Sequence, residues 1–550
     1  MRAVIPTAFR YWHTVRHLKP VQVYGRMRFW LRWRRVDARP APSRRAVSGW
    51  STGAERAPSM VGPTRFTFLN ERRDVAETGW DDPGVPRLWR YNLHYFDDLT
   101  ARHAAERTTW HDALIARWIA ENEPGAGTGW EPYPTSRRIV NWVKGAWEGR
   151  ALSAAACESL AVQTRWLSRR LELHLLGNHL FANAKALVFA GIFFEGPEAD
   201  AWLRQGLGVL SDQVREQLLP DGGQFERTPM YHALALEDML DLCNAAAAGA
   251  AALPRGARAT VASWRGAIPP MQRWLEAMCH PDGEIALFND AAIGVAPRPS
   301  ELQGYARRLG FPAPPLEGAV TWLRDSGYVR VAQDDAVAIL DVAPIGPDHL
   351  PGHAHADTLT FELSIAGRRV LVNSGASLYA PGTERERQRG TAAHNTVVVD
   401  GENSSEVWSA FRVARRARPE GVEVDEGPPP RIRCAHGGYR RLAGQPVHAR
   451  EWRFEPGALV VVDRLEGAAR RAEARFHLHP EIGVSAMTPT TAALSLPGGR
   501  RVAMSVEGGG MELERTTWHP EFGRTIPNHC LVVRLSGSSV RTVFRWDEAS

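Results

Sequence analysis

The chain is short of cysteine and has no long apolar run. Its 550 residues include five cysteines, Cys157, Cys243, Cys279, Cys434 and Cys530, which lie far apart and form no CxxC pair. This spacing excludes a disulfide framework and a zinc finger. No uncharged stretch of about 18 residues is present to span a membrane. The N-terminus also lacks the continuous apolar segment of a secretory signal.

Acidic residues are only slightly outnumbered by basic ones. The 61 Asp and Glu against 67 Lys and Arg give a formal charge of +6 and a pI of about 9.2. This small excess favours a polyanionic partner only weakly. The sequence contains no compact basic helix or nucleic-acid motif, so we do not expect a nucleic acid as partner.

The N-terminal arm is basic and aromatic, and it allows two interpretations. One is a structural arm that packs on the protein, which is favoured because Leu18, Pro20, Val21 and Val23 interrupt a long amphipathic face. The other is a peripheral membrane contact through residues 10–35, in which interleaved Arg and Trp lie on an anionic surface.

Two sequence textures divide the rest of the chain. Residues 87–315 carry apolar residues at helical spacing, in segments separated by Gly/Pro loops, and favour an α/α toroid or a helical solenoid. Residues 316–550 carry short Val-rich alternating runs bounded by turn signals. We therefore predict an α+β multidomain protein: an arm and irregular connector over 1–86, then the helical domain, then an antiparallel β-sandwich.

Polar residues at the start of two predicted helices are candidates for a site in the helical half. Asn178 and His179 begin the helix in LGNHLFANAKAL, where Asn178 would also be explained as an N-cap. Glu226, Arg227 and Tyr231 lie at a loop-to-helix junction in DGGQFERTPMYH. Tyr231 would equally suit a core position with its hydroxyl satisfied.

A third polar loop, GWEPYPTSRRIVNWV, holds Trp130, Tyr133, Arg137 and Arg138 just before a helix. Aromatic residues and paired arginines beside a helix N-terminus suit a subsite for an acidic sugar. The same residues would also suit an ordinary surface loop.

The β half opens with three ionisable side chains, His353, His355 and Asp357, in PGHAHADTLTFELSI. Alternate residues of a strand share one face, so these groups can converge with Asn373 and His394 at neighbouring strand ends. Two histidines and an oxygen ligand suit zinc, and a further histidine is left for proton transfer. Asn is an uncharged and weaker ligand than Asp, so zinc occupancy stays open. Asp357 would orient a histidine or act as a ligand itself.

Six motifs in this order resemble the heparinase II/III-like polysaccharide lyases, of the alginate- and heparin-lyase type: RYNLHYFDDL, WEPYPTSRRIVNW, LGNHLFANAKAL, DGGQFERTPMYH, GHAHADTLTFEL and AAHNTVVVDG. The motifs cover roughly residues 88–400. The resemblance implies an incomplete (α/α) toroid followed by antiparallel β-sheets, with the active site in the cleft between them. It also implies cleavage of the bond to O4 of a uronic acid by β-elimination.

The resemblance further implies residue roles. Asn178 and His179 would contact the uronate carboxylate, Tyr231 would be the catalytic tyrosine, and His353 a second candidate base. No organic cofactor is implied. A structural zinc would be held by His355, Asn373 and His394. The candidates for substrate binding are Trp130, Tyr133, Arg137, Arg138, Glu226 and Arg227.

Two other functions stay open beside a bacterial lyase of exopolysaccharide or surface-glycan metabolism. A glycoside hydrolase on a similar toroid would need two carboxylates beside the bond, for which Glu226, Glu237 and Asp238 are available. A non-catalytic protein that binds or assembles an acidic glycan would keep the cleft without turnover.

The location of the protein is also open between two expectations. The resemblance favours the periplasm or cell envelope, whereas the missing signal segment favours the cytoplasm or the inner membrane face. The sequence does not specify which uronic acid polymer is cleaved, endo or exo cleavage, whether Tyr231 or His353 is the base, or the oligomeric state.

Overall fold

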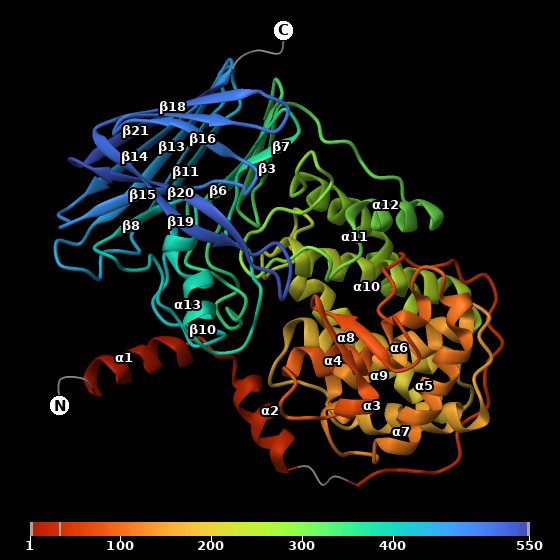
Figure 1. The fold of residues 1–550 in the computed structure, drawn as a ribbon. Helices are drawn as coiled ribbons and strands as arrows, with labels where there is room; N and C mark the ends of the chain where they lie inside the picture. The colour runs from red at the N-terminus through yellow and green to blue at the C-terminus, as the bar shows by residue number, and fades with distance from the viewer. Residues whose placement is uncertain (1–3, 32–34, 547–550) are drawn as a thin grey trace.

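A computed structural model describes residues 4–31 and 35–546, which form a helical region followed by a β region (Figure 1). The predicted order of helices first and antiparallel strands second is confirmed. None of the helices in these ranges is long and apolar enough to cross a membrane. The main helices are α1 Val4–Val15, α2 Pro20–Leu31, α4 Arg87–Tyr95, α5 Thr108–Glu121, α6 Pro132–Trp147, α7 Ala154–Ser168, α8 Gly177–Phe193, α9 Pro197–Gln217, α10 Pro229–Ala248, α11 Ala257–Ala277 and α12 Pro299–Arg308.

Helix α8 lies at the centre of the helical region. Its residues are nearly all buried, and it packs against α6, α7, α9 and α10. A helix that is apolar on every side, as in LFANAKALVFAGIF, is stable only when neighbours surround it. The first turns of α8 and α10 also meet the β region: the Cα of Gly177 faces Leu350, and the hydroxyl of Tyr231 contacts that of Tyr379.

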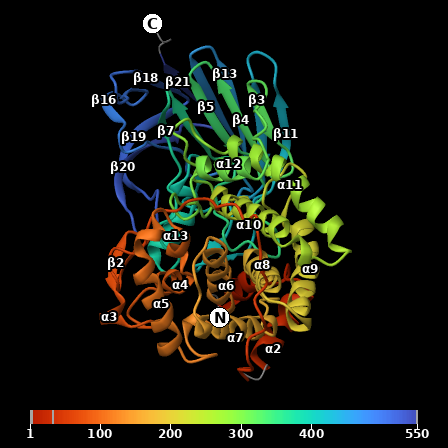
Figure 2. The same cartoon turned by 90° about the vertical axis from the view of Figure 1, so that its right-hand side faces the viewer.

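The β region consists mainly of three antiparallel sheets. A five-stranded meander lies over the helical region, where Leu323, Tyr328 and Ile339 pack on Trp274 of α11 and on Met278 directly after it (Figure 2). In sheet order, its strands are β3 Val320–Leu323, β4 Tyr328–Gln333, β5 Ala336–Asp341, β6 Phe361–Ile365 and β7 Arg368–Leu371.

The other two sheets complete the β core with buried aromatic residues such as Trp452, Phe476 and Phe544. The larger runs β11 Pro419–Asp425, β12 Arg431–His436, β13 Val447–Glu455, β14 Ala458–Glu466, β21 Ser539–Trp546, β18 Arg501–Glu507, β17 Thr491–Ser495 and β16 Gly483–Met487. The smaller runs β19 Gly509–Trp518, β20 Ile526–Leu535, β15 Ala472–His477 and β8 Val397–Val399. The short elements α13 Thr383–Arg389, β9 Val407–Trp408 and β10 Arg412–Val413 lie at the side of these sheets (Figure 1).

The connector is more ordered than its sequence predicts. Strands β1 Arg65–Phe68 and β2 Glu71–Asp74 form a hairpin, and the single turn α3 Val75–Thr78 follows. Asp74 caps that turn by accepting a hydrogen bond from the Ala76 N–H. Phe66 and Phe68 stack at 5.5 Å and join the core of the helical region. The burial of these two rings holds the hairpin in place.

The loop between β5 and β6 differs from the expected strand end. Residues 351–360 adopt no strand, and the alternating run becomes one only at Phe361. The His355 N–H donates to Asn289 Oδ1 at 3.0 Å, and the Ala356 N–H to the Arg389 carbonyl at 2.9 Å. Because the loop is not pleated, His353 can reach Tyr231 and His355 can reach His394 while both contact Asp290.

Candidate active site

A pocket lies beside the first turns of α8 and α10. Asn178 comes from α8 and Tyr231 from α10. Tyr133 and Arg137 come from the start of α6. Three separate helices therefore bring predicted site residues together. The other lining residues are Phe181, Gln217, Gln224, Leu234, Ala235 and Asp238.

Asn178 does not cap its helix. The capping position of α8 is Leu176, which has φ 59° and makes no side-chain hydrogen bond to the helix. Gly177 also has a positive φ, and a Cβ there would lie 2.5 Å from Leu350 Cδ2 of the β5–β6 loop. Glycine thus allows the loop that carries His353 to approach the helix. The interpretation of Asn178 as an N-cap is wrong, and its side chain lines the pocket.

His179 lies beside the pocket, between Glu172 and Tyr133. Its Nδ1 lies 3.1 Å from Glu172 Oε1, and its ring lies 4.6 Å from that of Tyr133. Burial acts to lower the pKa of His179, but the Glu172 carboxylate outweighs it and the net shift is upward. The imidazolium form therefore persists to a higher pH than in a free histidine.

Arg137 provides a second positive charge at the pocket wall. Its Nη2 donates to Asp97 Oδ1 at 3.1 Å, and its guanidinium lies 5.8 Å from the centre of the Tyr95 ring. The ion pair fixes the direction of this side chain. Tyr133, one turn earlier, is half-buried, and this desolvation raises the pKa of its phenol to about 12.

Tyr231 and His353 meet from opposite halves of the chain. Their rings are 4.1 Å apart with planes tilted by 34°. The Tyr231 hydroxyl lies 3.1 Å from that of Tyr379. Burial raises the pKa of Tyr231 well above its usual range, and Tyr379, Glu226 and Asp290 add to the shift. The phenol is therefore a proton donor in the resting site and not a phenolate.

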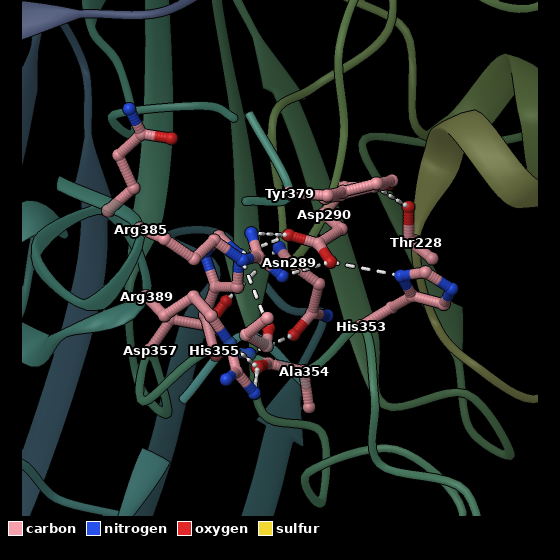
Figure 3. A network of polar contacts seen from close by, with 12 residues as sticks. Thr228, Asn289, Asp290, His353, Ala354, His355, Asp357, Tyr379, Arg385 and Arg389 are labelled. Carbon is pink, nitrogen blue, oxygen red and sulfur yellow. Dashed lines mark hydrogen bonds and ion pairs between the residues drawn. The ribbon is translucent and has the colours of Figure 1, made fainter. Parts of the chain in front are cut away.

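Asp290 fixes the orientation of His353. His353 Nδ1 lies 2.9 Å from Asp290 Oδ2, and Asp290 Oδ1 lies 2.8 Å from His355 Nε2 (Figure 3). Arg385 of α13 donates to the same carboxylate through both terminal nitrogens, one of them at 2.6 Å. These contacts hold the pKa of Asp290 well below its usual range in spite of burial. A carboxylate at Nδ1 keeps the proton there and leaves Nε2 of a neutral His353 with a free electron pair.

Glu226 is beside His353 but not on the pocket surface. It is buried, its Oε1 accepts from Gln224 Nε2 at 3.2 Å, and its Oε2 lies 3.8 Å from His353 Nε2. Burial raises the pKa of Glu226.

Three residues predicted to bind substrate lie elsewhere. Trp130 is buried and packs edge-on against Trp166 at 6.1 Å. Arg138 is fully buried over the Trp118 ring at 3.8 Å and donates to three internal acceptors. Arg227 points away from the pocket, where its Nε donates to the Ser326 carbonyl at 2.9 Å. None of the three is among the residues that line the pocket, and their donors and rings have partners inside the protein. A part in substrate binding stays a prediction for these three residues.

The three predicted zinc donors do not surround one point. His394 Nε2 faces His355 Nδ1 at 3.3 Å, while the opposite nitrogen, Nδ1, faces Asn373 Oδ1 at 3.2 Å. Asn373 Nδ2 is buried and has no hydrogen-bond partner. The Asn373 side chain is an uncharged amide and does not supply the negative charge of a carboxylate ligand. Within the described ranges no group of three His, Cys, Asp or Glu is arranged to hold a metal. The residues do not fit a three-donor site in this geometry, and zinc binding stays a prediction.

Asp357 does not contact a histidine as expected. Its Oδ2 accepts from the Asn289 N–H at 3.3 Å, and burial raises its pKa to about 6. The residue that orients both His353 and His355 is Asp290, which the sequence interpretation missed together with Arg385 and Tyr379. The sequence signal that could have pointed to Asp290 is its place directly after Asn289 at the end of the apolar run IALF.

The fold and this cleft define a protein with a helical toroid and an antiparallel β-sandwich. Two family models match it in the same order: Heparinase II/III N-terminus over residues 154–308, and Heparinase II/III-like, C-terminal over residues 316–547. The chain belongs to the heparinase II/III-like family.

Relatives of established name match part of the chain. It is 28% identical to a heparin-sulfate lyase of Bacteroides stercoris over 288 residues, which cover 46% of this chain and 40% of that protein. It is 27% identical to a heparin-sulfate lyase of Pedobacter heparinus over 253 residues, which cover 41% and 36%. The match thus spans less than half the length of these relatives.

Solved structures agree with the fold over a larger share of the chain. A crystal structure of heparinase III has a TM-score of 0.69 at 17% identity and covers 86% of this chain and 80% of that one. A Streptomyces coelicolor chondroitin AC lyase has a TM-score of 0.51 at 12% identity and covers 90% and 77%. At these identities the likeness establishes the toroid and β-sandwich architecture.

Proposed function

We propose that the protein is a polysaccharide lyase that cleaves a uronate-containing acidic polysaccharide by β-elimination. The observation that carries the proposal is the meeting of Tyr231 and His353 beside a pocket lined by Asn178, with His179 packed on its Tyr133 wall. The two heparin-sulfate lyases among its relatives support a substrate of the glycosaminoglycan type.

The first requirement of this reaction is neutralisation of the uronate carboxylate. A base removes the proton from C5, the electron pair forms the C4=C5 double bond, and the C4–O4 bond breaks as O4 takes a proton. The C5 proton becomes acidic only when the neighbouring carboxylate charge is balanced. In our proposal Asn178 donates a hydrogen bond to that carboxylate, and His179 and Arg137 supply positive charge.

The two proton transfers are divided between His353 and Tyr231. Asp290 holds the Nδ1 proton of His353, so Nε2 accepts the proton from C5. Tyr231 keeps its proton until O4 leaves, because its pKa is raised, and then donates it. The hydroxyl of Tyr379, 3.1 Å away, donates to the phenolate that forms.

The hydrolase alternative is less compatible with the surroundings of two of its candidate carboxylates, Asp238 at the pocket and the buried Glu237. Asp238 accepts from Lys185 Nζ at 2.6 Å, and Glu237 is paired with Arg56. Carboxylates bound to cations in this way are poor general acids, because the cation disfavours the protonated form. The lyase proposal uses neither residue.

The proposal is tested by incubating the protein with a panel of uronate polymers and analysing products by mass spectrometry. A lyase gives fragments with a 4,5-unsaturated uronate at the new non-reducing end. Saturated fragments that have gained water would indicate the hydrolase. Tight binding of a polymer without any fragment would indicate the non-catalytic glycan-binding protein.

We further propose that the protein acts at the cell envelope, in exopolysaccharide or surface-glycan metabolism, and that its N-terminal arm contacts a membrane. The support is the chemistry of the arm, in which exposed aromatic residues such as Trp12 and Trp30 alternate with arginines. Fractionation of the tagged protein tests this location, and a wholly soluble pool would contradict it.

A further inference from the structure

The exposed apolar side chains of the molecule are concentrated in its N-terminal arm. Where side chains are described, thirteen large hydrophobic residues are exposed, and ten of them lie between Phe9 and Leu31. The others are Val61, Phe411 and Leu513. Isolated exposed apolar residues are normal, but a cluster of this kind marks an interaction surface.

The inner faces of both arm helices are already occupied. On α1, the Tyr11 ring lies 5.0 Å from that of Trp408, whose Nε1 donates to Thr14 Oγ1 at 3.2 Å. On α2, Phe29 lies 4.6 Å from the His174 ring, and Gln22 Nε2 donates to the His349 carbonyl at 3.1 Å. The arm is therefore fixed to the body of the protein, and its other face points outward.

The outward face of α2 has the pattern of a helix that lies in a membrane surface. At 3.6 residues per turn, Val23, Tyr24, Met27, Trp30 and Leu31 fall on one side of the helix. All five are exposed, with Trp30 at 74% and Leu31 at 78%. This stripe lies opposite the buried Gln22 and Gly25.

Arginines border the apolar stripe of α2 on both sides. Arg26 falls at one edge of the stripe and Arg28 at the other, and both are exposed. Long basic side chains in such positions reach the headgroups while apolar neighbours enter the acyl boundary. Figure 1 shows α1 and α2 following one another at an angle along the outside of the molecule, away from the toroid centre.

The charge of the arm identifies the kind of surface. The 36 residues before Asp37 contain nine Lys or Arg and no Asp or Glu. Because the whole chain carries +6, the remaining residues are net acidic at −3. The positive charge of the protein is thus a property of the arm, and it complements an anionic partner.

We infer that this face, residues Phe9 to Leu31, docks on an anionic lipid bilayer. A soluble acidic polysaccharide would match the arginines but would not cover Val23, Met27 and Leu31, whereas the bilayer satisfies both. The inference deepens the membrane contact proposed above and does not depend on the lyase activity. Docking through α2 would also place the bilayer near the candidate active site, because α2 contacts His349 in the loop that continues to His353.

The test is co-sedimentation of the full chain with vesicles of phosphatidylcholine, with and without phosphatidylglycerol. We expect binding to the anionic vesicles that weakens with salt. Arg26→Gln/Arg28→Gln should lower the partition about 30-fold, since each basic residue near such a surface contributes about 1 kcal/mol. Met27→Ser/Trp30→Ser/Leu31→Ser should lower it by about 10³-fold or more, because three large apolar side chains lose about 1.5 kcal/mol of burial or more each.

Matched controls make the same changes outside the arm. Leu513→Ser removes an exposed apolar side chain of β19, and Arg255→Gln/Arg258→Gln removes two exposed charges near the start of α11. Both should bind vesicles as the unchanged protein does. The inference is overturned if the anionic vesicles are not bound, or if the arm variants bind them equally well.

Two further results would also overturn it. One is a dimer that the triple arm variant converts to a monomer without vesicle binding, which would make the face a contact between copies. The other is loss of uronate-polymer binding in the arm variants with vesicle binding unchanged. Vesicle binding without any unsaturated product would instead count against the lyase proposal alone.

Discussion

The Nδ1 atom of His353 lies 2.9 Å from the carboxylate of Asp290, which also binds His355 and Arg385. This contact joins the β5–β6 loop, the segment after α11 and helix α13 in one buried network (Figure 3). It determines which nitrogen of His353 faces the pocket. The proposed removal of the C5 proton by His353 Nε2 depends on this contact.

Asp290→Asn should therefore lower kcat by about 10²-fold or more, because an amide can stabilise the wrong tautomer of His353 and removes the charge opposite its imidazolium. KM should change much less. Nitrogen chemical shifts of His353 give an independent measure of its tautomer. The matched control is Asp357→Asn, a buried carboxylate of the same loop that contacts no histidine. Equal kcat in Asp290→Asn and the unchanged protein would contradict this role.

Removal of the two facing hydroxyls should separate their contributions. Tyr231→Phe should abolish most activity, about 10²–10⁴-fold in kcat, because the leaving O4 loses its proton donor. Tyr379→Phe should give a smaller loss, since it only stabilises the phenolate. Each change removes one hydrogen bond, so thermal unfolding should show a cost of about 1 kcal/mol. A Tyr231→Phe enzyme with normal kcat would exclude the assigned proton donor.

Substrate affinity should depend on pH through His179. The pKa of His179 is raised above 6.5, so its cation is present below that raised value and is lost as the pH rises through it. KM should therefore increase on the alkaline side. In His179→Gln, KM should be higher and should no longer show this dependence. Initial rates across a pH series measure it, and an unchanged KM profile in the variant would be inconsistent with carboxylate recognition by His179.

Two neighbouring arginines should behave in opposite ways. Arg137→Met should raise KM, because Arg137 lines the pocket, and should leave folding nearly unchanged. Arg138→Met should leave KM unchanged but destabilise the protein by about 3 kcal/mol, because buried carbonyls lose their donors. Urea unfolding and KM measured on the same samples compare the two. A raised KM in the folded fraction of Arg138→Met would show that Arg138 takes part in substrate binding.

The pair Arg137 and Arg138 also explains where sequence interpretation succeeds and fails. Motif order and periodicity predicted the two-part fold, and helix starts located Asn178, His179 and Tyr231. Adjacent residues of a helix point about 100° apart, so one arginine faces the pocket and the other the Trp118 ring. Nothing in the sequence states which of the two is buried.

Long-range partners escaped prediction for a related reason. Asp290 and Arg385 are 95 positions apart, and Arg385 stands in TERERQR, a run that is typical of an exposed helix. Tyr379 follows a buried strand in an irregular segment and contacts Tyr231 across 148 positions. Such contacts depend on tertiary packing, which local propensity and spacing do not encode.

The most direct test of β-elimination is the near-ultraviolet absorbance of the reaction mixture during incubation with uronate polymers, glycosaminoglycans first. We expect absorbance to rise with time and enzyme concentration, as the conjugated C4=C5 uronate forms, and Tyr231→Phe at equal concentration to give almost no rise. Cleavage of a polymer without any rise in absorbance, or an equal rise with Tyr231→Phe, would contradict it.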